Sequence, residues 1–145
     1  MKQNEVRHIP LHMPNILSIC VNDYHDGEIQ GEIFHCYDRN SWRFANVMQM
    51  MELIEELYNR ISFPQAAFRI RTLTDREPQQ KTYLEKQISA EEIAEKRGRI
   101  GTFLLSVKYR QNVSWQGEVE WLEGGELSEF SSALELVKII SNQVK

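Results

Sequence analysis

The feature that most constrains this chain is an internal repeat, offset by 86 residues along the sequence. Without a gap, Gln30-Gly31-Glu32-Ile33 falls on Gln116-Gly117-Glu118-Val119, and Phe44 falls on Phe130. Apolar positions before and after these segments match as well, which is the signature of a duplicated structural unit. We therefore predict a single domain over residues 1–145, with a first repeat at about 16–60 and a second at about 102–145.

Each repeat is predicted to form two strands and one helix. Alternating polarity indicates strands, and apolar residues at intervals of three and four indicate helices. The predicted elements are 16–24, 28–37 and 44–60 in the first repeat, and 102–110, 114–122 and 130–143 in the second. Such alternation is typical of an antiparallel sheet with one buried face and one face in water.

Local signals support these boundaries. Asp26-Gly27 favours a tight hairpin turn. Asn46 with Gln49 and Ser132 with Glu135 fit the capping box that begins a helix. The repeated glycine of the second strand, Gly31 or Gly117, has inward parity and indicates a bulge or a close approach of a helix.

A polar connector separates the repeats. A further strand is predicted at 64–74, and the connector at 75–101 includes a short helix at 90–97 that begins at Ser89. The predicted fold is α+β: a two-layer sandwich with a mainly antiparallel sheet of five to seven strands and two helices on one face.

Composition narrows the functional classes. The chain has 145 residues, 41% of them hydrophobic and 26% charged, and a net charge of −4. These values are ordinary for a globular protein and unlike a protein that coats DNA, which is basic. The sequence contains no apolar run of the ~18–20 residues that a membrane span needs, and no signal-peptide core at its start, so we expect a cytoplasmic protein without a membrane partner. Cys20 and Cys36 are expected to be buried, reduced thiols.

The second repeat carries the most specific local pattern, RQN-x-SWQG-x-V-x-WLEG followed by Phe-x-Ser-Ala-Leu-Glu-Leu, between Arg110 and Leu136. This pattern resembles a family of small uncharacterised proteins common in clostridia-like Gram-positive bacteria. The resemblance extends to Pro64-Gln65-Ala66 after the first helix and covers most of the chain. It implies membership of that family and no known activity.

Catalytic and metal sites find little support in the sequence. Glu118 or Glu120 with His35 is the acid–base set that an enzyme would use here, but the chain lacks a serine or cysteine in a nucleophile elbow, and no histidine recurs between the repeats. His8 and His12 have helical spacing, yet Pro10 between them argues against a helix. We predict no catalytic residue, no cofactor and no metal.

Charge is unevenly distributed along the chain. Residues 60–110 carry a balance of +5, against −5 for residues 1–59 and −4 for residues 111–145. A basic stripe on the outward face of neighbouring strands is therefore a candidate binding surface for phosphates or an acidic partner, and its members are Arg69, Arg71, Arg97, Arg99, Lys108 and Arg110. The alternative is that these cations pair with glutamates on the same face.

Trp42 is the remaining candidate, since a tryptophan in the loop before the first helix either marks an interface or packs at the edge of the core. The leading hypothesis is a non-catalytic binding or adaptor module that acts through a protein partner or through self-association. The first alternative is nucleic-acid association through Arg69, Arg71, Lys108 and Arg110. The second alternative is a small enzyme with glutamate acid and base residues.

Overall fold

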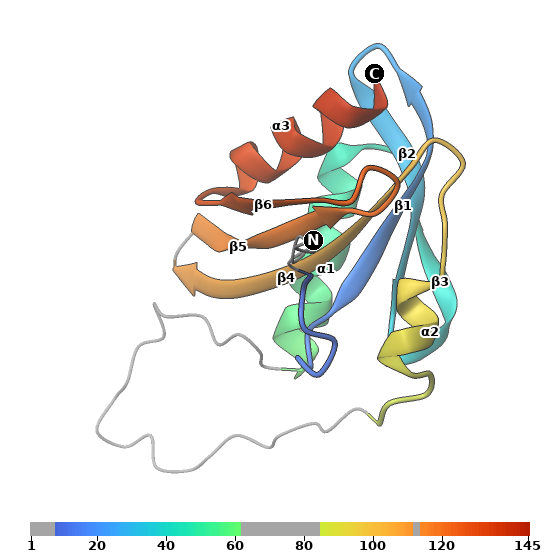
Figure 1. Ribbon diagram of the computed structural model, residues 1–145, viewed down its shortest axis with the longest axis vertical. Helices are drawn as coiled ribbons and strands as arrows, with labels where there is room; N and C mark the ends of the chain where they lie inside the picture. Colours follow the sequence, from blue (N-terminus) through green and yellow to red (C-terminus); the bar gives the residue numbers. More distant parts are fainter. Residues whose placement is uncertain (1–7, 62–84, 112–113) are drawn as a thin grey trace, which may run out of the picture.

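The computed structural model describes residues 8–61, 85–111 and 114–145, which form six strands and three helices (Figure 1). In chain order these are β1 (Leu17–His25), β2 (Glu28–His35), β3 (Asp38–Phe44), α1 (Val47–Ile61), α2 (Ala90–Ala94), β4 (Gly101–Gln111), β5 (Ser114–Trp121), β6 (Glu126–Phe130) and α3 (Ala133–Val144). The strands form one sheet in the order β3-β2-β1-β4-β5-β6, and every neighbouring pair is antiparallel. The predicted α+β class is confirmed, and the predicted strand at 64–74 lies outside the described residues.

The same order of elements occurs twice, as β1, β2, β3 and α1 and then as β4, β5, β6 and α3. At the centre of the sheet Ser18 of β1 lies opposite Leu104 of β4, the residue 86 positions further on. The edge strands β3 and β6 were not predicted. Each carries charged or polar side chains at most positions, as edge strands often do, and such a pattern is hard to distinguish from a loop.

The helix starts follow the predicted capping boxes. Asn46 Oδ1 accepts a hydrogen bond from the backbone N–H of Gln49 at 2.8 Å, and Ser132 Oγ accepts one from the backbone N–H of Glu135 at 3.0 Å. The α2 helix is likewise capped by Ser89, but it ends at Ala94 and is shorter than predicted. These bonds satisfy backbone donors that a helix start otherwise leaves without partners.

The main core lies between one face of the sheet and the helices α1 and α3. Its strand members come from alternate positions, as a strand with one face in the core requires. Tyr58 of α1 is fully buried there, and its hydroxyl donates a hydrogen bond to the backbone oxygen of Asn15 at 3.2 Å. Burial raises the pKa of the Tyr58 phenol, so this group stays a neutral donor.

Both repeated glycines lie opposite a β-bulge. The pairing of β1 with β2 shifts between Val21 and Asp23, and that of β4 with β5 shifts at the equivalent place, between Val107 and Tyr109. A Cβ atom on Gly31 would overlap the carbonyl oxygen of Cys20, and one on Gly117 would overlap that of Ser106. The bulge prediction is confirmed, because the bulged strand brings its backbone to where a side chain would stand.

The sequence predicted that the second face of the sheet is exposed to water. The centre of that face is instead covered. A smaller apolar cluster covers it, in which Ile9 and Ile16 of the N-terminal segment and Ile93 of α2 pack with Cys36 and Leu104. The strand alternation reports only the strand's own side chains and gives no sign of this covering. Both cysteines are buried, as predicted, and burial raises the pKa of the Cys20 thiol to about 11.

Two glutamates of β5 are buried on this face of the sheet. Glu120 is 3% exposed, and its carboxylate contacts His8 Nδ1 at 2.7 Å and accepts a hydrogen bond from the backbone N–H of Ile9 at 3.3 Å. Glu118 is 5% exposed and lies 3.6 Å from the Lys108 ammonium. The Lys108–Glu118 pair agrees with the alternative in which outward cations pair with glutamates on the same face, whereas the expected exposure of this face to water is wrong at these two positions.

Candidate functional site

The predicted basic stripe does not form a single row. Arg69 and Arg71 lie outside the described residues. Lys108 lies on the second face of the sheet, where it pairs with Glu118. Arg110 lies on the opposite face, beside α1, where its guanidinium is 3.2 Å from the Glu55 carboxylate. The prediction that Lys108 and Arg110 share one outward row is therefore wrong.

The bulge in β4 is the physical reason. Val107 lies opposite Gly117 and Tyr109 lies opposite Gln116, so Lys108 is the extra residue. One extra residue exchanges the faces of every side chain that follows it in the strand. Without the bulge, Tyr109 would share the core-facing side of the strand with Phe103, Leu105 and Val107, but it is 64% exposed, and Arg110 is buried.

Arg97 and Arg99 are exposed and follow the short helix α2. The Arg97 guanidinium donates to the backbone oxygens of Ala94 and Lys96, both at 2.8 Å, and the Arg99 backbone N–H donates to Asn22 Oδ1 at 2.9 Å. These contacts tie both residues to the end of α2 and to β1. They do not extend the predicted stripe.

Trp42 belongs to the edge strand β3, not to a loop as predicted, and it is half-buried. Its indole N–H donates to Asp38 Oδ2 at 2.9 Å, and its ring meets that of His35 edge to face with centroids 4.3 Å apart. The Arg60 guanidinium lies 5.7 Å from its ring centroid. Trp42 therefore packs at the edge of the core, the second of the two roles considered for it.

The acid–base set of the enzyme alternative is not brought together. His35 belongs to the core-facing row of β2, while Glu118 and Glu120 lie on the second face of the sheet. His35 is 1% exposed, and its Nδ1 accepts a hydrogen bond from the Tyr37 backbone N–H at 3.1 Å. Burial lowers the pKa of His35 to about 4, so the ring is neutral near pH 7. These three residues therefore do not form a catalytic site.

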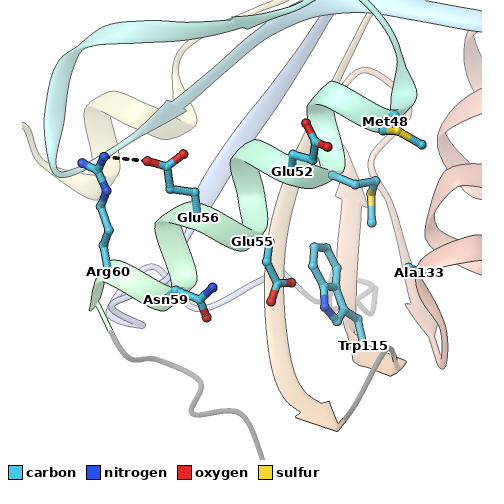
Figure 2. Close-up of a pocket in the computed structure, with 9 residues that line it drawn as sticks. Met48, Glu52, Glu55, Glu56, Asn59, Arg60, Trp115 and Ala133 are labelled. Carbon is cyan, nitrogen blue, oxygen red and sulfur yellow. Dashed lines mark hydrogen bonds and ion pairs between the residues drawn. The ribbon is translucent and has the colours of Figure 1, made fainter.

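A groove on the helical side of the sheet is the candidate functional site. It has a volume of about 820 Å³ and runs along α1, with Trp115 of β5 as its floor and Ala133 at the start of α3 on the opposite side (Figure 2). Its lining residues are Met48, Met51, Glu52, Glu55, Glu56, Asn59, Arg60, Trp115 and Ala133. The volume and the mixture of apolar and charged lining are typical of a binding site.

The floor of this groove is a buried aromatic side chain. Trp115 is 4% exposed, and its ring packs against that of Tyr58 with centroids 6.2 Å apart. Met48 and Met51 of α1 line the same groove, and Met48 is 69% exposed. An exposed methionine beside a preformed apolar floor is a feature of protein-binding surfaces, because the flexible thioether adapts to its partner.

The α1 wall of the groove is acidic. Glu55 pairs with the buried Arg110, which also donates to Asn59 Oδ1 at 2.9 Å. Glu56 pairs with Arg60 at 2.5 Å, one helical turn further on. Burial lowers the pKa of Arg110, and the nearby Glu55 carboxylate opposes this shift. Arg110 therefore positions the side chains of Glu55 and Asn59 on the wall of the groove.

Glu52 differs from the other two carboxylates. It is exposed, and it has no hydrogen-bond or ion-pair partner within the part of the chain that the structure describes. Glu52 follows Met48 by one helical turn, and its carboxylate points away from Trp115, at the outer rim of the groove (Figure 2). A free carboxylate at this place is available to a cation of a bound molecule.

The sequence analysis did not identify the groove. Met48 and Leu134 belong to the apolar helical pattern from which α1 and α3 were predicted, yet they are 69% and 65% exposed. The fully buried positions of α1 are Met50, Ile54, Leu57 and Tyr58. The sequence carried no signal of this exposure, because adjacent apolar residues can both be buried in one helix, as Leu57 and Tyr58 are in α1.

In residues 8–61, 85–111 and 114–145, no group of three His, Cys, Asp or Glu side chains is placed to hold a metal ion. None of the described helices has the length and apolar character to cross a membrane. No protein-family model matches this chain, and no curated protein or solved structure is found to be similar to it.

Proposed function

We propose that this protein is a non-catalytic binding module and that the groove along α1 receives a segment of a protein partner in the cytoplasm. The observation that carries the proposal is the exposed Met48 beside Met51 and Trp115 in a groove of about 820 Å³. Exposed apolar side chains over a preformed hollow stabilise a complex by burial, at roughly 25 cal/mol per Å² of apolar surface removed from water.

The arrangement of the floor supports this role. Trp115 is held by Tyr58, and Tyr58 is held by Asn15, whose side-chain amide donates to the Val107 backbone oxygen at 2.6 Å. The floor therefore keeps its shape before a partner arrives. Preorganised surfaces bind more tightly because less conformational freedom is lost on association.

The nucleic-acid alternative is less well supported than it was from sequence. It relied on a continuous row of cations, and Arg110 instead pairs with Glu55 on the helical side of the sheet. Self-association remains an outcome of the experiment below, because a second copy is also a protein partner.

We also infer that the domain is a two-layer sandwich that arose by duplication of a strand-strand-strand-helix unit, within the family whose sequence pattern it resembles. Three observations support this history: the order of elements, the equivalent bulges opposite Gly31 and Gly117, and the equivalent capping boxes at Asn46 and Ser132. Each pair is separated by 86 residues.

The proposed function is tested by isolating the tagged full chain from its host and comparing it with two variants. Met48→Asp places a charge in the groove, while Tyr109→Asp alters an equally exposed apolar residue on the opposite face of the sheet. We expect a partner that copurifies with the wild type and Tyr109→Asp and is lost with Met48→Asp.

Nuclease treatment of half of each sample separates the alternatives. Partners lost only after nuclease treatment would favour nucleic-acid association, and recovery of the tagged chain with untagged copies of itself would identify self-association. A partner retained equally by Met48→Asp would show that the groove is not the binding surface.

A further inference from the structure

The groove suits a helix better than an extended chain. Its lining runs along α1 from Met48 to Arg60, which is about 18 Å or three helical turns. β5, which supplies the floor, pairs with β4 on one side and with β6 on the other, so its backbone offers no free edge to an added strand. An extended peptide on an apolar floor would leave backbone groups without partners, whereas a helix satisfies its own.

The charges on the α1 wall indicate which charge a bound helix should carry. Glu55 and Glu56 are balanced by Arg110 and Arg60, but each carboxyl side chain stays close to half exposed, at 46% and 49%. Arg110, in contrast, is 3% exposed in its side chain and is closed off from a partner. Because Glu52 pairs with no cation among the described residues, the described part of this wall presents more negative than positive charge to a partner.

We propose, building on the binding function above, that the groove receives a basic amphipathic helix of a partner protein. Its apolar residues, at positions i, i+3 or i+4 and i+7, pack against Met48, Met51 and Trp115. A lysine or arginine on the flank of that stripe pairs with Glu52, and Glu55 accepts a second one at the next turn.

The other half of the molecule lacks this combination of an acidic helix wall and a tryptophan floor. The positions equivalent to Glu52, Glu55 and Trp115 are Lys138, Ser141 and Ile29. A basic helix laid along α3 would meet a like charge at Lys138 and no indole floor. The repeat therefore supplies an internal comparison in which the backbone is similar and the proposed recognition is absent.

The test measures binding of two synthetic helical peptides to the full chain by fluorescence anisotropy. Each has about 18 residues, long enough to form helix on a surface. Both carry leucine along one face, and one carries lysine on the remaining faces where the other carries glutamate. The protein variants are Met48→Asp, Glu52→Lys and the matched control Glu126→Lys, which changes the net charge equally on the edge strand β6.

We expect the lysine peptide to bind the wild type and the glutamate peptide to bind more weakly. Glu52→Lys should lower the affinity for the lysine peptide by about fivefold and raise the affinity for the glutamate peptide. Glu126→Lys should change either affinity by less than about twofold. Met48→Asp should remove binding of both peptides. Unchanged thermal unfolding of each variant shows that its fold is intact.

Two results overturn the inference and separate it from the function it rests on. Equal affinity for both peptides, with loss of both in Met48→Asp, would contradict the basic helix and leave the groove as a binding surface. Absence of binding by either peptide, or binding that Met48→Asp does not alter, would contradict the helix proposal outright. In that case the copurification experiment decides whether the groove binds anything else.

Discussion

The two halves of the molecule share their backbone details and differ in what they present to solvent. Each half has the same bulge, a glycine opposite it and a capped helix after the third strand. Yet the wall of α1 carries Glu52, Glu55 and Glu56, where α3 carries Lys138, Ser141 and Asn142. The features common to both halves are those that fix the backbone, so the features of one half alone are the better guide to function.

The largest loss of stability is expected from substitution of the shared glycines, Gly31 and Gly117, and it should be similar in both halves. Gly31→Ala and Gly117→Ala place a Cβ atom on a backbone carbonyl oxygen of the neighbouring strand. That oxygen cannot move without disturbing the strand pairing, so we expect a loss of about 4 kcal/mol in the free energy of unfolding for each, at the upper end for one substitution.

Urea unfolding measures this loss, and Gln116→Ala, at an exposed neighbouring position of β5, is the control. A loss below about 1 kcal/mol at one glycine alone would show that the two bulges are not equivalent.

A somewhat smaller loss of stability, caused by acid, should arise from the first half only. His35 is buried and neutral, with a pKa of about 4 in place of its ordinary 6.5, and the equivalent residue of the second half is Trp121, which does not titrate. Because the unfolded chain takes up the proton more readily, the stabilisation is complete above about pH 6.5 and is lost as the pH falls towards 4. The expected loss is about 3 kcal/mol.

The measurement is urea unfolding at pH 7 and at pH 4.5 for the wild type and for His35→Gln. The wild type should lose more unfolding free energy on acidification than the variant does, because protonation at Nδ1 also removes the hydrogen bond from the Tyr37 N–H. Equal pH dependence in the two proteins would mean that His35 is not the group responsible.

Much of the fold could be predicted from local patterns. Alternation, the turn at Asp26-Gly27 and the capping boxes are properties of neighbouring residues, so the strands and helices of both halves were predicted close to their observed positions. The edge strands β3 and β6 escaped prediction because one or both of their faces carry polar side chains.

The candidate site was harder to predict because it depends on register and on long-range packing. The bulge at Lys108 exchanges the faces of Tyr109 and Arg110, and the sequence signal of Gly117 allowed a bulge without placing it. Likewise, Glu120 is contacted by a segment more than a hundred residues away in the sequence, at His8 and Ile9. Strand alternation carries no information about such a covering.

The most direct test of the central claim compares the two equivalent exposed positions, Met48 in the groove wall and Leu134 on α3. A photo-crosslinking amino acid is placed at each in turn, and the full chain is irradiated in its host cells. The account predicts that position 48 forms a covalent adduct with one partner protein and that position 134 does not. Adducts of equal yield at both positions, or an adduct at position 134 alone, would contradict the assignment of the binding surface to the α1 groove.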